Sequence, residues 1–187
     1  MYRINTLLKL KRELYHTRDL ALVWGVKNPN TLYTTIKRYI KKGILIPIHN
    51  GFYSTLPLEK VDPYKLAVGY LHRFAYVIGE TVLIKDSIIF QKGYYITLVS
   101  DISKKFTIDR YSFMTKKLAS KYLFNNTGIE EQNGVSWATV ERAIADLLYF
   151  NPNYHFDNRK IINWKKVRQI QKEVGYYDSS KTRRRYS

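Results

Sequence analysis

The sequence predicts an α+β protein, with a helical N-terminal domain closed by a β-hairpin and a small mixed α/β C-terminal domain. Two observations predict this architecture. Apolar residues recur at helical spacing through most of the first 42 residues, and the dipeptide Asn50-Gly51, a preferred two-residue hairpin turn, follows them. Two prolines then interrupt the pattern. We therefore expect one domain at residues 1–57 and a second at 62–176.

The composition favours a polyanionic partner. Among 187 residues there are 32 Lys and Arg against 15 Asp and Glu, a net charge of +17, and such an excess is typical of nucleic-acid-binding proteins. The last residues, 177–187, form a basic segment that we expect to be a disordered tail. The sequence has no cysteine, which excludes disulfides and thiolate metal sites, and we expect neither a metal nor a cofactor.

The N-terminus alternates leucine with lysine instead of forming a continuous apolar run. It therefore does not resemble a signal peptide. No apolar run approaches the roughly 20 residues of a membrane span. We expect a soluble, cytoplasmic protein without a membrane partner.

Two short helices are predicted first. Asn5 can cap a helix, and Thr17 can cap a second helix that Gly25 ends, since glycine tolerates a positive φ. The apolar stripe of the first helix consists of Leu7, Leu8, Leu10 and Leu14.

A third helix is predicted by Asn28-Pro29, a capping side chain followed by proline at the first helical position. Gly43 closes it. The stripe expected to be buried consists of Leu32, Ile36, Tyr39 and Ile40.

A hairpin follows the third helix. Alternating apolar residues at 44–48 predict a strand, and Pro47, which lacks an N–H group, restricts that strand to a sheet edge. Residues 52–55 return as its partner after the Asn-Gly turn. Three helices followed by a hairpin are typical of a winged helix-turn-helix.

The remaining face of the third helix is suited to a DNA major groove. It carries amide and hydroxyl groups near its start and cations further along, and no acid occurs between residues 20 and 58. Amide and hydroxyl groups can hydrogen-bond base edges, and cations can hold phosphates. The expected base contacts are Asn30, Thr31 and Thr34; the expected phosphate contacts are Lys37, Arg38, Lys41 and Lys42. Arg18 and His49 should add contacts to the DNA backbone.

The second half alternates strands and helices. Asp62-Pro63 starts a helix, Thr139 caps another, and a last amphipathic helix covers about 164–174, whereas residues 81–90 fit either a helix or a strand. Strands are expected at 76–78, 94–99, 106–108, 111–113, 122–124 and 135–138.

No catalytic group of residues is recognisable, so we expect no enzyme activity. The four histidines are scattered, and the sequence has no glycine-rich phosphate loop or nucleophile elbow. Asp86, Asp101 and Lys104 leave a nuclease as a minor alternative, although their spacing is not that of a nuclease triplet. Arg142 and Asp146, four residues apart, should form a surface ion pair.

Four segments are informative when they are taken together, namely Arg38–Tyr53, Tyr76–Gly79, Gly93–Ser100 and Ala138–Tyr149. The last of them is the most telling, because it begins Ala-Thr-x-Glu-Arg-Ala and continues Asp-Leu-Leu on a predicted helix. In this order and spacing the segments resemble the AbiEi-type antitoxins, regulators from bacterial and archaeal abortive-infection toxin–antitoxin systems, and the resemblance runs from about residue 5 to 175.

The resemblance implies a winged helix that binds inverted repeats of double-stranded DNA in the promoter of its own operon and represses it. It also implies a C-terminal antitoxin domain and a nucleotidyltransferase-like toxin as partner. Palindromic operators require two copies of the chain, either as a dimer or as a cooperative pair on DNA. The main alternative is a protein-interaction antitoxin that neutralises its toxin by direct contact. RNA binding is a weaker variant, because the major groove of RNA is too narrow for a helix.

Overall fold

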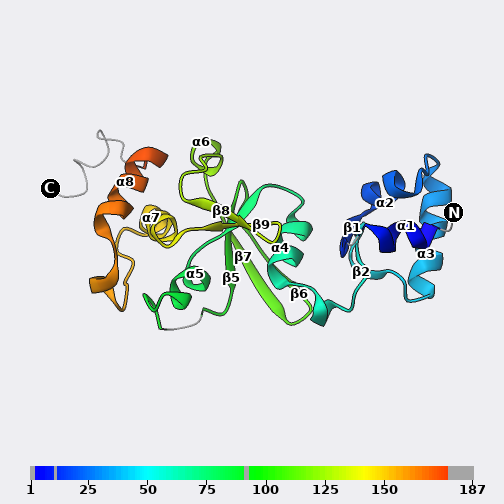
Figure 1. The fold of residues 1–187 in the computed structure, drawn as a ribbon, viewed down its shortest axis with the longest axis horizontal. Helices are drawn as coiled ribbons and strands as arrows, with labels where there is room; N and C mark the ends of the chain where they lie inside the picture. The colour runs from blue at the N-terminus through cyan, green and yellow to red at the C-terminus, as the bar shows by residue number, and fades with distance from the viewer. Residues whose placement is uncertain (1–2, 11, 91–92, 177–187) are drawn as a thin grey trace. The chain divides into compact units, whose positions relative to one another are not determined.

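The structure is a computed structural model that describes residues 3–10, 12–90 and 93–176 (Figure 1). The chain divides into two compact units, Met1–His72 and Arg73–Ser187. The described residues form eight α-helices and two β-sheets, so the predicted α+β class is confirmed at that level. None of the described helices has the length and apolar character to cross a membrane. The basic tail predicted at 177–187 lies outside the described residues.

The first unit begins with three helices, α1 (Arg3–Lys9), α2 (Thr17–Trp24) and α3 (Pro29–Lys41). The predicted start of α3 is confirmed, because the Asn28 side chain accepts hydrogen bonds from two backbone N–H groups of the first turn. The predicted end of α2 is also confirmed, with Gly25 at φ 62°.

A three-stranded antiparallel sheet completes this part of the first unit, with β1 (Leu14–His16), β2 (Ile46–His49) and β3 (Phe52–Ser54) in the order β1-β3-β2. Pro47 lies on the edge strand β2, as predicted.

Two predictions for residues 14–17 were wrong. Leu14 is not helical but pairs with Ser54 in the sheet, because this register buries the adjacent Tyr15 completely. Thr17 is the first helical residue rather than the cap; His16 occupies the cap, and its backbone N–H donates to the Asp19 carboxylate at 2.8 Å.

Helix α4 (Pro63–Leu71) belongs to the first unit, preceded by the 3₁₀ turn Leu58–Lys60. The division of the chain therefore lies at His72, ten residues beyond the start of the second domain expected from sequence. Contacts with the β-sheet explain the difference: the His16 ring nitrogen Nε2 lies 2.9 Å from the Gly69 carbonyl oxygen. A Cβ at Gly69 would lie 2.6 Å from the Phe52 ring, so only glycine allows this approach.

The second unit is built on a six-stranded mixed sheet in the order β6-β7-β5-β4-β9-β8. The pairs β4–β9 and β5–β7 are parallel and the others antiparallel. The strands are β4 (Ala75–Val77), β5 (Ile96–Ser100), β6 (Lys104–Ile108), β7 (Tyr111–Lys117), β8 (Ile129–Gln132) and β9 (Val135–Ala138).

Helices and a 3₁₀ turn complete the second unit. They are α5 (Glu80–Lys85), α6 (Ser120–Leu123), the 3₁₀ turn Arg159–Ile161, α7 (Val140–Phe150) and α8 (Trp164–Val174).

Helix α5 resolves one ambiguous prediction, and helix α6 corrects another prediction. The ambiguous segment 81–90 contains a helix, α5. The strand expected at 122–124 was wrong. The N–H groups of Tyr122 and Leu123 both bond the Ala119 carbonyl in helix α6, which turns Leu123 into the core.

Candidate nucleic-acid interface

Helix α3 presents one polar, positively charged face to solvent. Asn30, Thr34, Lys37 and Lys41 follow one another at spacings of four, three and four residues and are all exposed, so they form a line along the helix. The opposite face buries Leu32, Thr35, Ile36 and Tyr39. The burial of the apolar stripe thus fixes which side chains point outward.

All nine residues predicted to contact DNA are exposed. Seven lie on α3 or its C-terminal cap, one near the start of α2 and one at the end of β2. They are Arg18, Asn30, Thr31, Thr34, Lys37, Arg38, Lys41, Lys42 and His49.

A hollow of about 780 Å³ separates α3 from the β2–β3 hairpin. Lys37 on the helix and His49 at the end of β2 both line it, together with Asn50 of the turn. The structure therefore brings these two predicted residues to one concave surface. The other predicted residues do not line this hollow.

Tyr33 is a candidate that the sequence reasoning missed. It is 52% exposed and lines the same hollow, four residues before Lys37 on the helix. The available signal was an aromatic residue outside the buried stripe of α3, at helical spacing from a predicted phosphate contact.

The acids nearest the start of the chain are engaged locally. The Asp19 carboxylate accepts from Arg12 at 2.7 Å and from the His16 backbone, and Glu13 lies 3.9 Å from the Lys65 ammonium group. Because no acid occurs between residues 20 and 58, the cations of α3 have no carboxylate on their own segment. This arrangement can hold phosphates along the helix.

In residues 3–10, 12–90 and 93–176, no three His, Asp or Glu side chains gather closely enough to hold a metal ion. Asp101, one member of the possible nuclease triplet, accepts two hydrogen bonds from Arg73 at 2.8 and 2.9 Å. These bonds lower the pKa of Asp101, as expected for a structural ion pair.

The prediction that Arg142 and Asp146 form a surface pair was wrong. Both side chains are wholly buried, and Arg142 Nε donates to Asp146 at 2.9 Å. Tyr76 and Tyr176 also donate to this carboxylate through their hydroxyl groups. The pair is inside because α7 is covered on several sides, so that every residue from Arg142 to Leu147 is buried.

All five N–H donors of Arg142 have acceptors. Besides Asp146 and the Tyr76 hydroxyl, at 3.0 Å, they reach three backbone carbonyls at 2.9 to 3.1 Å. These carbonyls belong to Tyr122, Asn125 and Thr127.

Burial raises the pKa of Asp146, against the effect of Arg142, and raises the pKa values of Tyr76 and Tyr176. Arg142 thus ties residues 122–127 to helix α7 through hydrogen bonds, which is a structural role.

The comparisons with known proteins give no family. No protein-family model matches the chain, and no curated protein matches it.

Proposed function

We propose that the chain is a sequence-specific DNA-binding repressor and that its first unit is a winged helix-turn-helix. The observation that carries the proposal is the exposed, acid-free face of α3, with Asn30 and Thr34 before Lys37 and Lys41 along one line. Hydrogen-bonding groups near the N-terminus of the helix suit base edges, and the cations behind them suit phosphates.

The neighbouring elements support the same proposal. In this reading α2 and α3 are the two helices of the helix-turn-helix, and the β2–β3 hairpin is the wing. The hollow between α3 and the hairpin, lined by Lys37 and His49, would then receive one strand of the DNA backbone.

The biological role rests on the resemblance of the sequence to AbiEi-type antitoxins. We propose that the protein represses its own operon and acts as the antitoxin of a toxin–antitoxin pair. This role requires no catalytic step by the chain, and a palindromic operator would seat two copies about 34 Å apart along the DNA.

Binding to the promoter DNA of its own operon tests the proposal. The purified chain is titrated with that duplex and with a scrambled duplex of equal length at about 150 mM salt. A preference of about 10³-fold or more supports a specific repressor. Equal, salt-sensitive binding to both duplexes would overturn it, because the net charge alone would then explain the binding.

A second candidate is an antitoxin that contacts its toxin directly. Exposed aromatic side chains of the second unit favour it: Phe124 is 61% exposed beside Phe74, and Tyr149 is 40% exposed and stacked on Tyr176. Co-purification with the neighbouring gene product at high salt tests this candidate, since an apolar interface survives screening. Loss of the complex at high salt would contradict an apolar contact.

A further inference from the structure

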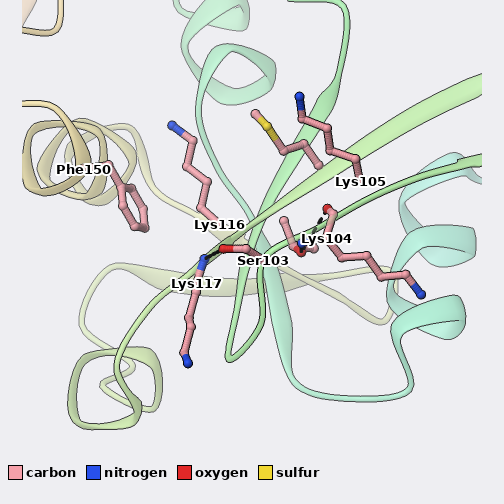
Figure 2. Close-up of a pocket in the computed structure, with 8 residues that line it drawn as sticks. Ser103, Lys104, Lys105, Lys116, Lys117 and Phe150 are labelled. Atoms are coloured by element: carbon pink, nitrogen blue, oxygen red, sulfur yellow. Dashed lines mark hydrogen bonds between the residues drawn. The ribbon is translucent and has the colours of Figure 1, made fainter.

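A shallow hollow of about 420 Å³ lies over the β6–β7 hairpin of the second unit (Figure 2). Among the described residues that line it there are four lysines and no acid. The residues that line the hollow include Lys104, Lys105, Lys116, Lys117, Met114 and Phe150. Only Lys104 was considered from the sequence, as part of the nuclease alternative, and none of the six was predicted to bind a ligand.

The strand register divides the four lysines between the two faces of the hairpin. Lys105 is opposite Met114, and Lys116 follows Met114 by two residues, so these three side chains share one face. Lys104 and Lys117 belong to the other face. Figure 2 shows the same division, with Lys105 and Lys116 extending to one side and Lys104 and Lys117 to the other.

The first face combines charge with an apolar surface. Phe150, the last residue of α7, is half-buried, and the Lys116 ammonium group lies 5.2 Å from the centre of its ring. Lys105 lies 5.1 Å from the ring of Tyr95. Two ammonium groups thus lie beside aromatic rings and a half-buried methionine.

The framework under this face is fixed by hydrogen bonds. Strand β7 pairs with β5 on one side and β6 on the other. The backbone N–H of Lys117 donates to the Ser103 hydroxyl at 3.1 Å, and that of Lys104 donates to the Thr115 hydroxyl at 2.8 Å. A site on such paired strands is held in place before a ligand arrives.

We propose that this face of the hollow binds a nucleotide, with its phosphates at Lys105 and Lys116 and its base against Phe150. Ammonium groups bind phosphates, and a base stacks on an aromatic ring whatever its identity. The volume is within the range of small-ligand pockets. A free nucleotide and an unpaired nucleotide of a nucleic-acid strand share this chemistry. The site does not depend on DNA binding by the first unit.

Calorimetric titration of the full chain tests the proposal with ATP, inorganic triphosphate and an unstructured single-stranded oligonucleotide. We expect ATP or the oligonucleotide to bind and the double variant Lys105→Ala/Lys116→Ala to weaken binding roughly tenfold or more. The matched variant Lys104→Ala/Lys117→Ala removes the same charge and should change binding by less than about twofold. Whichever of the two ligands binds more tightly identifies the source of the nucleotide.

The contribution of the base is tested by Phe150→Leu, which keeps an apolar side chain at the end of α7 but removes the ring. It should weaken ATP binding about tenfold and leave inorganic triphosphate unaffected. Circular dichroism melting checks that each variant is folded.

Three results would overturn the proposal: no binding of either nucleotide ligand, equal loss in the two double-lysine variants, or equally tight binding of inorganic triphosphate and ATP.

The variant Lys37→Ala/Lys41→Ala separates this site from the α3 face. It should bind ATP normally even if it no longer binds promoter DNA, and loss of its ATP binding would also overturn the proposal.

Discussion

Helices α3 and α7 begin with similar capping residues, but α3 is largely exposed and α7 is largely buried. Each begins with a side chain that accepts from backbone N–H groups, Asn28 for α3 and Thr139 for α7, and each has an apolar stripe at helical spacing. Only four of the 13 residues of α3 are buried, whereas six consecutive residues of α7 are. The number of elements packed around a helix decides whether its polar residues face water or the core.

The consequence is a different role for charge in each helix. The cations of α3 are exposed and have no acid on their segment, so they are available to a ligand. The cation of α7, Arg142, uses all five donors inside the protein and is available to none. Helical position alone therefore does not identify a binding residue.

The largest expected effect is on the stability of α7. Arg142→Ala leaves the Asp146 carboxylate buried without its cation, and we expect a loss of about 3–5 kcal/mol in the free energy of unfolding. Urea denaturation measures it. The matched control is Gln169→Ala, which removes an exposed hydrogen bond to Glu173 at the same i,i+4 spacing and should cost under about 0.5 kcal/mol. Equal losses in the two variants would contradict the difference between buried and exposed pairs.

The second prediction concerns the exposed face of α3. Asn30→Ala should lower affinity for the preferred DNA site by about 1–3 kcal/mol and change affinity for scrambled DNA little. Lys41→Glu should weaken binding to both duplexes alike, because phosphates carry no sequence information. Fluorescence anisotropy with both duplexes measures these effects.

Lys60→Glu is the control for Lys41→Glu, since it makes the same charge change at an exposed site of the first unit outside α3. It should have a much smaller effect on DNA binding. A uniform loss of affinity in both the Asn30 and the Lys41 variants would show that α3 is not the recognition helix.

The third prediction compares the two helix caps. Asn28→Ala and Thr139→Ala should each cost about 1 kcal/mol, because each removes a side-chain acceptor from the first turn. Thermal denaturation checks both. Replacement of either residue by Ser should restore most of the loss, and failure of Ser to do so would show that the cap is not the cause.

The smallest effect is on the pH dependence of the first unit. Burial lowers the pKa of His16, and the charges of His72 and Arg12 act in the same direction, whereas the hydrogen bond to the Gly69 carbonyl and the charge of Asp19 oppose them. The folded state therefore binds fewer protons than the unfolded state below the ordinary pKa of 6.5, so stability should fall as the pH drops below that value. Melting at about pH 7.5 and about pH 5.5 measures the change. His16→Gln should reduce the pH dependence, and an unchanged slope would exclude His16 as its source.

The local signals in the sequence located most elements correctly. Asn28-Pro29 placed α3, Asn50-Gly51 placed the hairpin, and the apolar spacing after Thr139 placed α7. In α3, the spacing of the apolar residues also showed which residues are exposed, because a single apolar stripe leaves the rest of a helix to solvent. The roles of those residues in DNA binding stay predictions.

Long-range pairing accounts for the elements that were misplaced. Leu14 lies in a strand because Ser54, forty residues later, pairs with it, and Tyr122 lies in a helix because the following Leu123 packs into the core. Such partners are distant in sequence, so periodicity within a short window does not register them.

The sequence alone determined the α+β class, the net positive charge of the chain and the outward face of α3, since each depends on composition or on neighbours within a few turns. The tertiary structure decided that Arg142 and Asp146 are buried and that Lys105 and Lys116 share a face with Met114 beside Phe150. The physical reason is the same in both cases. Burial and the meeting of strands with a helix depend on contacts between residues that the chain brings together only when it folds.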